Sequence, residues 1–567
     1  MTMSQVHATV TRDLSRPNSG QKEILRRIQF SRLSLLYSCF YVANIVTEPL
    51  KAYVSEPLPW LLRHVSLNTS SLSFDDYVNV TYSFLVSKYN TRTLAPDSVF
   101  SRDKDANTAL LRSRMTLPSS SPDDCDAFVI HFPGSIFYGQ GMVDFVCHFL
   151  AQNASAQLTA PQSICQHNKI AGLLFSDSCT WLDPIPNATA GTFWVYHAVQ
   201  IEEFATWSWV KFGLRISLAI FIAMQVWTLY YCEYGPLLYN LRTKGLSNDD
   251  GGLYDIQIGD PTWLILSHPF ICAAMVVDIL YSTAYTAITG YRVGQVQDLW
   301  EFAIGSFSGS NMVWAAYAIM LFSTPLIKIL RWEKYFAPVD PGIIALTAAI
   351  YAGPLFYLII QTPIVLFFQL ITQIGVPADA KGQSLDAITG MVFLFQMFAS
   401  VPLINSICFQ CAHRRRRIRL WRAPAAPTRE GVAFASMRYN DWKYRGLYPG
   451  RKLTTAESGG TLYQLFDANP RLRKLPLFSC RGTDCFVRCV GEVTGQITHQ
   501  YRLSLLSGLD VPMISLGDQC MATIESQRST TGAVCVFVKP SSTLASSNKL
   551  TAPLALIPAS SNCRWLL

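Results

Sequence analysis

Charged residues are scarce in this chain. Aspartate, glutamate, lysine and arginine make up 15% of its 567 residues, whereas about 25% is usual for a soluble domain. The shortage is concentrated between residues 207 and 411, where long apolar runs contain few charges. Both flanking regions have the composition of ordinary soluble protein. The chain therefore cannot be soluble throughout, and we predict a multi-pass α-helical membrane protein with a folded part on either side of the membrane.

The motifs of the common enzyme classes are also absent from the sequence. There is no P-loop, no H-E-x-x-H pair, no Rossmann glycine pattern and no kinase signature. The run that begins at Gly305 is not a G-x-S-x-G nucleophile elbow, because Phe307 stands in place of the serine. The two halves of the membrane block show no repeat, so an inverted-repeat transporter has no support. We expect no catalytic residue, no metal site and no cofactor, and an enzyme is the least favoured class.

Glycosylation sequons are confined to one stretch, residues 51–206. This stretch contains four N-x-[ST] sequons, at Asn68, Asn79, Asn153 and Asn187. It also holds an even number of cysteines, which suits two disulfides in an oxidising compartment: Cys125, Cys147, Cys165 and Cys179. Three pairings of these cysteines are open. Segments 77–89, 127–132 and 192–201 are rich in Val, Tyr, Phe and Thr and are read as strands. We predict a glycosylated α+β outer domain.

Six apolar segments predict six membrane spans, at residues 33–47, 212–232, 263–289, 302–330, 343–374 and 387–411. The first is short and follows a basic N-terminal segment, residues 1–32, which we expect to be disordered. The absence of a cleavage motif favours a retained signal-anchor over a cleaved signal peptide. The fifth is too long for one straight crossing and contains Gly353-Pro354 and Thr362-Pro363, so we expect a kinked helix.

Positive charges give the orientation of these spans. With the amino end inside, each short exterior loop holds one cation, Arg292 or Lys381, and the interior loops hold more: Arg242, Lys244, Arg331 and Lys334. The sequons independently place residues 51–206 outside. We therefore predict six spans with both ends cytosolic, in the plasma membrane or a secretory or endolysosomal membrane of a eukaryote.

A basic cluster follows the sixth span, and it consists of Arg414, Arg415, Arg416, Arg417, Arg419 and Arg422. It stops transfer through the membrane, and its size also suits binding of anionic lipid at the cytosolic face. The overall charge of +8 is explained by this basic cytosolic side, so we expect the bilayer and no nucleic acid as a partner. Residues 423–567 are read as a β-rich cytosolic domain with strands near 484–493, 496–506, 521–526 and 533–538 and a disordered end.

Asp278 is the one acidic residue well inside a predicted span. A carboxylate at membrane depth is costly unless it is paired or hydrated, so its default interpretation is functional. Tyr281 and Tyr285 follow at helical spacing and give a polar stripe. Arg215 in the preceding span is the nearest partner. The competing interpretation is a structural ion pair, in which Arg215→Gln would compensate for Asp278→Asn.

Asn311 and Gln396 are further polar candidates in the fourth and sixth spans. Close helix packing through Gly305 and Gly309 and interhelical hydrogen bonds are the favoured explanations for these regions. If Asp278, Asn311 and Gln396 converge on one aqueous path, the helix block from 212 to 411 is a channel or transporter. If they do not, a sensor, receptor or adaptor is favoured.

In layout the chain resembles polycystin and mucolipin channels, which carry a glycosylated domain between the first two of six spans. This resemblance implies a channel whose pore elements lie between the last two spans, where this chain has only residues 375–386. Two function classes therefore stay open. We favour a sensor, receptor-like protein or adaptor that couples the outer domain to the cytosolic domain, over a gated channel or solute transporter. Either class leaves room for an unidentified outer ligand or solute and for an oligomer.

Overall fold

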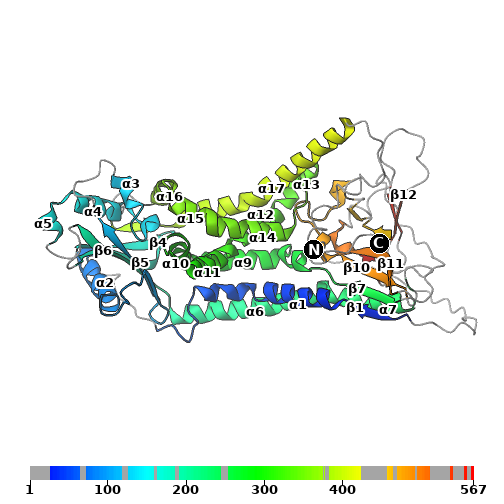
Figure 1. Ribbon diagram of the computed structural model, residues 1–567, viewed down its shortest axis with the longest axis horizontal. Coiled ribbons are helices and arrows are strands. Elements are labelled where there is room, and N and C mark those ends of the chain that lie inside the picture. The colour runs from blue at the N-terminus through cyan, green and yellow to red at the C-terminus, as the bar shows by residue number, and fades with distance from the viewer. Residues whose placement is uncertain are drawn as a thin grey trace, which may run out of the picture.

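The protein is elongated, with a sheet-containing domain at each end of a helical block (Figure 1). This computed structural model describes residues 26–63, 72–117, 125–158, 162–185, 191–243, 245, 253–374, 376, 382–422, 456–460, 462–463, 466, 469–491, 495–510, 537–540, 554–557 and 563–566. The first 25 residues, which we expected to be disordered, lie outside this range. So does much of the tail after residue 540, but two parts of that end, which we also expected to be disordered, form the strands β13 (Leu554–Ile557) and β14 (Trp565–Leu566).

Four helical stretches are long and apolar enough to cross a membrane, and two bent helix pairs raise the number to six when each pair counts as one span. The stretches cover residues 205–243, 299–329, 341–360 and 388–412. Their main helices are α6 (Ala205–Leu229), α11 (Leu299–Gly309), α12 (Val313–Phe322), α13 (Thr324–Ile329), α14 (Pro341–Ile350), α15 (Phe356–Ile360) and α17 (Ile388–Arg422). The bent pairs are α1 (Arg32–Val46) with η1 (Glu48–Val54), and α9 (Pro269–Tyr281) with α10 (Thr283–Gly294).

The third predicted span, 263–289, is not one straight helix. It consists of α8 (Thr262–Leu266), α9 and α10, and the last two are bent by 74° relative to each other at Ser282. No glycine or proline at this position announces the bend. Instead the Arg215 guanidinium donates to the Ser282 hydroxyl over 2.7 Å, so a tertiary contact holds the chain where the apolar pattern alone suggested a continuous helix.

The fifth predicted span is distorted at the first proline pair and broken at the second. Gly353 and Pro354 lie in a π-helical segment, η6 (Tyr351–Leu355), within a helical stretch that is continuous over residues 341–360, whereas a break at Pro363 separates α16 (Ile364–Gln373). Proline removes a helical hydrogen bond and clashes with the preceding turn, which explains both the distortion and the break. α16 lies beside the outer domain (Figure 1). One of its faces is exposed and apolar, at Ile364, Phe367 and Leu370.

The outer domain is built on a six-stranded sheet in the order β2-β3-β6-β5-β4-β8. Five strands come from the predicted outer region: β2 (Phe100–Asp103), β3 (Thr108–Thr116), β4 (Gln162–Ile170), β5 (Leu173–Pro184) and β6 (Thr192–Ile201). The sixth, β8 (Ser384–Asp386), comes from the loop before the last span and pairs parallel with β4. The four cysteines form two disulfides as predicted, Cys125–Cys147 and Cys165–Cys179.

Two segments read as strands are helices. Residues 77–89 fall in α2 (Phe74–Lys88), whose buried residues Tyr77, Thr81 and Leu85 recur at helical spacing. Ser73 caps this helix by accepting a hydrogen bond from the Asp76 backbone N–H. Residues 127–132 overlap α3 (Cys125–Val129), which the disulfide joins to α4 (Gln140–Ala151). These segments have a high β-propensity, but they form helices because the helical conformation packs their apolar residues against the sheet.

The second large sheet, at the other end, has the order β1-β7-β10-β11-β14, with β9 also paired to β11. The strands are β1 (Ile28–Phe30), β7 (Leu253–Gln257), β9 (Ala456–Gly459), β10 (Cys485–Val490), β11 (Ile497–Leu505) and β14 (Trp565–Leu566). β10 and β11 correspond to predicted strands, and segment 521–526 lies outside the described residues. Residues 28–30, expected to be disordered, form β1 because they add to the edge of β7.

Each sheet therefore combines segments that six crossings would place on the same side of a membrane. One sheet combines residues 100–201 with the loop before α17, and the other combines the N-terminal strand, the loop before α9 and the tail. If the chain crosses a membrane six times, successive connecting segments must lie on alternate sides, and the composition of the two sheets agrees with this. The orientation relative to a membrane stays a prediction.

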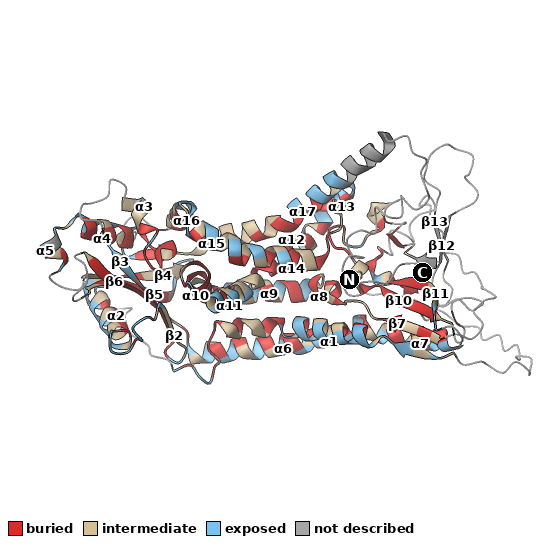
Figure 2. Ribbon diagram, viewed as in Figure 1, coloured by how far each residue is buried: buried red, intermediate tan, exposed pale blue. Residues whose placement is uncertain are grey.

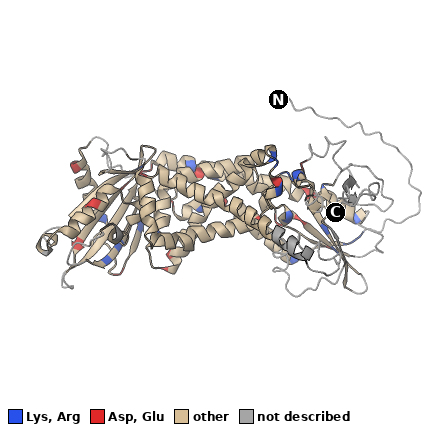
Figure 3. Cartoon of the chain, turned by 90° about the horizontal axis from the view of Figure 1, so that it is seen from above, with Lys and Arg blue, Asp and Glu red and all other residues tan. Residues whose placement is uncertain are grey.

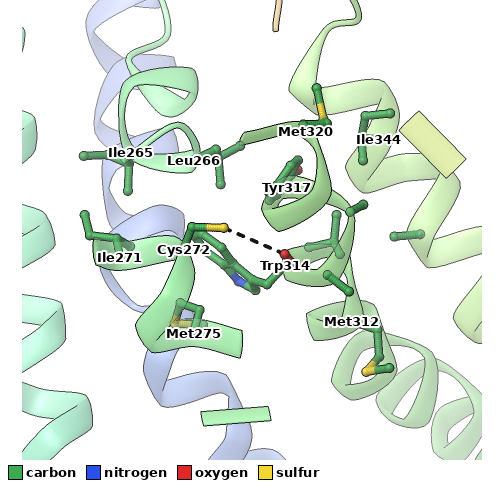
Figure 4. Packing of buried hydrophobic residues seen from close by; sticks show 14 of the residues in the cluster. Ile265, Leu266, Ile271, Cys272, Met275, Met312, Trp314, Tyr317, Met320 and Ile344 are labelled. Atoms are coloured by element: carbon green, nitrogen blue, oxygen red, sulfur yellow. Dashed lines mark hydrogen bonds between the residues drawn. The ribbon is translucent and has the colours of Figure 1, made fainter. Parts of the chain in front are cut away.

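The helical block has an apolar interior and an apolar exterior. At its centre Cys272 and Met275 of α9 face Trp314 and Tyr317 of α12, and the Cys272 thiol donates to the Trp314 carbonyl (Figure 4). Exposed residues line the outward faces of α1, α6 and α17 (Figure 2). On α1, Leu36 and Phe40 are among the exposed large apolar residues. Charged residues are sparse along the helices (Figure 3). An apolar outer face of this kind suits lipid contact.

Two of the predicted glycosylation sites are exposed. Asn79 lies on the outer face of α2, and Asn153 precedes α5 (Ala154–Gln157), whereas Asn68 and Asn187 lie outside the described residues. We expect glycosidase treatment to lower the apparent mass of the wild-type protein, and Asn79→Gln and Asn153→Gln each to remove one step of that shift. A tag at Leu567 should resist external protease in intact cells. A wild-type protein without any glycan would contradict the predicted orientation.

Candidate functional site

A buried ionic network lies where the outer domain meets the helical block. Its charged members come from four segments of the chain: Glu56 follows η1, Glu203 follows β6, Lys211 and Arg215 are on α6, and Asp278 is on α9. Apart from Asp278, whose side chain is 19% exposed, each is at least nine-tenths buried. Charges are costly away from water unless they are paired, so their partners decide what the cluster does.

Arg215 is the centre of this network. Its two terminal nitrogens donate to the two carboxylate oxygens of Glu56 over 2.8 and 2.9 Å. Its Nε donates to Asp278 Oδ1 over 2.8 Å, and a terminal nitrogen also donates to Ser282. The two-pronged contact with Glu56 is the strong geometry for a guanidinium and a carboxylate. Arg215 thus joins the end of the first span to the bend of the third.

Lys211 extends the network to the outer sheet. Its Nζ donates to Glu56 Oε2 over 2.9 Å and to Glu203 Oε2 over 2.8 Å. The Tyr285 hydroxyl of α10 donates to the same Glu203 oxygen over 2.7 Å. Asn107, in the turn between β2 and β3, donates to that hydroxyl over 3.0 Å. The contacts run without a break from the membrane helices to the sheet.

The network holds two cations and three carboxylates. Lys211 and Arg215 face Glu56, Glu203 and Asp278. Arg102 is joined to the network through the side-chain oxygen of Asn107, to which it donates over 2.8 Å. Burial would raise the pKa of Glu56, but the charges of Arg215 and Lys211 outweigh it and lower the pKa to about 2. Glu56 is therefore a carboxylate at neutral and mildly acidic pH, and the network acts as a clamp between segments.

The structure brings together only some of the predicted site residues. Arg215, Asp278 and Tyr285 all belong to the network. Tyr281 does not: it is half exposed and packs edge-on against Trp207. A functional role for any of these residues stays a prediction.

The other predicted residues lie elsewhere. Among the described residues, no hydrogen bond links Asn311 or Gln396 to Asp278: Asn311 lies in η4 (Ser310–Met312), and Gln396 is exposed on α17. Gly305 and Gly309 allow close packing, since a Cβ on Gly305 would lie 2.9 Å from that of Arg292. The side chains of the arginine cluster, Arg414 to Arg422, lie outside what the structure describes.

Sequence reasoning missed Glu56, Glu203 and Lys211. The first two lie outside the apolar runs, so they looked like ordinary surface acids. A usable signal was present in α6: Lys211 and Arg215 are one turn apart on the same helix face within a span. Two cations on one face at membrane depth need carboxylates from neighbouring segments. Since Asp278 is a single carboxylate, the two cations indicated that at least one further acidic residue had to lie nearby.

A mostly apolar cavity lies next to the network. Its walls come from the outer sheet, α10, α15, α16 and the start of α17, and its volume is about 40 Å³. No charged side chain lines it. The polar groups on its wall are uncharged and comprise Asn168, Ser176, Thr283, Thr286, Tyr291 and Thr372.

Asp386 ties this cavity to the sixth span. It ends β8, and its Oδ1 accepts from the Ile388 N–H at the start of α17 over 3.0 Å. The same carboxylate accepts from the backbone N–H groups of Ala171 and Gly172, in the turn between β4 and β5. Its neighbours Leu385 and Ala387 line the cavity. One residue therefore holds a sheet turn, an edge strand and the long helix α17 together.

Two histidines of the outer domain make specific contacts, and one of them is buried. The His167 ring stacks on Tyr77 and makes a 2.8 Å hydrogen bond with Asp177. His197 is fully buried between Thr180 and the Tyr291 hydroxyl, and burial lowers its pKa to about 3, so it is neutral. Among the residues that the structure describes, no group of three or more His, Cys, Asp or Glu side chains could hold a metal ion.

Comparison with known proteins assigns no family to this chain. No protein-family model, no curated protein and no solved structure matches it. Its function is therefore argued from its own contacts.

Proposed function

We propose that this protein is a membrane sensor or receptor that couples its outer domain to its cytosolic domain. The observation that carries the proposal is the continuity between spans and sheets at both ends. α1 begins at Arg32, directly after β1 ends at Phe30, and α17 begins at Ile388, directly after β8 ends at Asp386. A displacement of either sheet edge therefore moves a membrane helix without a flexible linker between them.

The ionic network gives this coupling a second route. α1 is attached to one sheet through β1, and the chain that follows it supplies Glu56 to Arg215 and Lys211. Glu203 follows β6 of the other sheet and binds the same Lys211. Packed elements with two discrete arrangements can transmit a change between distant sites. The alternative, a gated channel or transporter, has no comparable observation in its favour, because the intramembrane charges are paired with one another.

Asp386→Ala tests the coupling. This change removes the cap of α17 and its bonds to the β4–β5 turn, at a cost of about 1 kcal/mol, which corresponds to a rise of about fivefold in local opening. We expect hydrogen exchange to rise at least about twofold also in the far sheet, at residues 253–257 and 485–490. Hydrogen–deuterium exchange of the purified full-length protein in lipid nanodiscs measures this.

Asp298→Ala is the matched control. Asp298 caps α11 by accepting from the Glu301 N–H over 2.9 Å, so its loss weakens a helix start without removing a bond to the sheet turn. We expect the far sheet to exchange as in the wild type. A response to Asp386→Ala that stays within the outer domain, or an equal far-sheet response to both variants, would overturn the proposal.

A further inference from the structure

We infer that Cys408 and Cys411, at the cytosolic end of α17, are a site of S-acylation by long-chain fatty acyl groups. This inference goes beyond the proposed coupling and does not depend on it. It rests on the predicted cytosolic position of this end of the chain. Three features carry it: two exposed thiols on one helix face, their level at the edge of a span, and the basic segment that follows them.

The two thiols lie on the face of α17 that points away from the rest of the protein. Both cysteines are free and exposed. Ile404, one turn before Cys408 on the same face, is 53% exposed. The opposite face is held to the loop before α14, because the Ser406 hydroxyl donates to the Ala337 carbonyl over 2.6 Å. An exposed apolar face suits contact with lipid, so the thiols adjoin the bilayer.

The level of the thiols is the predicted boundary between span and cytosol. The apolar stretch of α17 ends at Ala412, directly after Cys411. The Gln410 side chain donates to the Lys334 carbonyl over 2.8 Å, and Trp332 in the same loop is 47% exposed. Exposed aromatic side chains are typical of the membrane interface. Cysteines next to a membrane at such a boundary are a common position for reversible S-acylation.

The direction of the helix favours insertion of an attached chain into the bilayer. α17 begins at the outer sheet and ends on the predicted cytosolic side, and side chains on a helix tilt toward its N-terminus. The sulfur atoms of Cys408 and Cys411 are therefore expected to incline toward the membrane. An acyl chain on either sulfur would extend along the Ile404 face, where its methylene groups leave water.

The arginine cluster supplies a second attachment to the membrane. It begins at Arg414, three residues after Cys411, and clusters of this size bind anionic headgroups of the inner leaflet. A single acyl chain gives reversible membrane binding, whereas acylation combined with a polybasic segment gives stable anchoring. The backbone of α17 continues to Arg422. Acyl chains and arginines together would hold this end of the helix at the membrane surface.

The reaction is an exchange of one thioester for another. The cysteine sulfur attacks the carbonyl carbon of a long-chain acyl coenzyme A, and a new S–C bond forms as the bond from that carbon to the coenzyme A sulfur breaks. The cysteine proton leaves with coenzyme A as its thiol, and nothing is oxidised or reduced. Two cysteines in C-x-x-C spacing could instead form a disulfide, which a reducing cytosol disfavours.

Acyl exchange on the full-length protein from eukaryotic cell membranes tests the inference. The protein is reduced, its free thiols are blocked with N-ethylmaleimide, and thioesters are cleaved with neutral hydroxylamine. Each released thiol is then tagged with a maleimide polymer that adds one step in apparent mass. We expect two hydroxylamine-dependent steps. Cys408→Ala and Cys411→Ala should each remove one step, and the double variant should remove both.

Cys39→Ala and Cys232→Ala are the matched controls. Both of these cysteines are also free and exposed, and neither is followed by an arginine cluster. Cys39 lies within α1, and Cys232 lies in η3 (Tyr231–Glu233), where Glu233 is paired with Arg564 of the tail. Each control variant should keep both steps.

Each result bears on the inference. Steps that persist when Cys408 and Cys411 are both alanine would overturn it. A wild-type protein without a hydroxylamine-dependent step would do the same, whether its thiols are free or become available only after reduction, as in a disulfide. Mass spectrometry of the wild-type peptide gives the answer without a variant, since an acyl mass on each sulfur supports the inference and unmodified thiols contradict it. The exchange response to Asp386→Ala is a separate measurement, so the coupling proposal and the acylation site fail independently.

Discussion

Arg215→Gln is expected to destabilise the protein more than any other single change in the helical block. The side chain is 1% exposed and binds Glu56 through two hydrogen bonds, besides Asp278 and Ser282. Its removal leaves Glu56 with Lys211 alone and Asp278 without its partner. Removing one member of a buried ion pair costs about 3–5 kcal/mol. Thermal unfolding of the purified protein, together with its amount at the cell surface, measures the loss.

Asp278→Asn should be milder, because Arg215 keeps its two-pronged contact with Glu56. The geometry also changes what the double variant should do. If Asp278 were the sole partner of Arg215, combining Arg215→Gln with Asp278→Asn would restore stability. Glu56 instead accepts two of the hydrogen bonds of Arg215. We therefore expect the stability of the double variant to stay close to that of Arg215→Gln alone. Lys88, whose ion pair with Asp103 is partly exposed, provides the control: Lys88→Gln should have a much smaller effect, because exposed pairs contribute little to stability. Full recovery in the double variant would contradict the central role of Glu56.

Removal of the Cys165–Cys179 disulfide is expected to have the next largest effect. Both cysteines are fully buried on neighbouring strands, between the sheet and α2, in contact with the cluster around Tyr77 and Trp181. The bridge closes a loop with a sequence separation of 14, for which chain entropy gives about 3 kcal/mol. We expect Cys165→Ala with Cys179→Ala to lower the Tm of the outer domain by roughly 6–12 °C.

The control for this pair is Cys408→Ala with Cys411→Ala. Both of these cysteines are free and exposed on α17, so their loss removes two thiols and no cross-link. Differential scanning fluorimetry of the two double variants isolates the effect of the bridge. Equal Tm values in the two variants would show that the bridge adds nothing to stability.

Composition and periodicity predicted the broad architecture. The apolar runs located the helical stretches, and the proline pairs at 354 and 363 located the π-helical distortion and the break of the fifth. Runs rich in β-branched and aromatic residues and the Gly turns between them located β6, β10 and β11. The sequence also named Arg215 as the nearest partner of Asp278, and the two side chains are hydrogen-bonded. These features depend on local patterns, which a single sequence records.

The features that were missed depend on distant residues. β8 has only three residues and no alternation of its own, and it is a strand because β4 offers it an open edge. β1 is a strand for the same reason beside β7. Glu56 and Glu203 have no membrane signature, and only Lys211 and Arg215 make them part of a site. Ser282 bends a span because of a contact with another helix, which no residue around it announces.

The shared sheets have a consequence for how the chain is made. β4 and β5 leave the ribosome long before β8, so the outer sheet keeps an open β4 edge until the sixth span has been inserted, and an exposed strand edge is prone to pair with other chains. The far sheet is completed even later, because β7 can pair with β10 only after the tail has been synthesised. A fragment that ends before residue 384 should therefore aggregate or be retained by quality control even though residues 51–206 are complete.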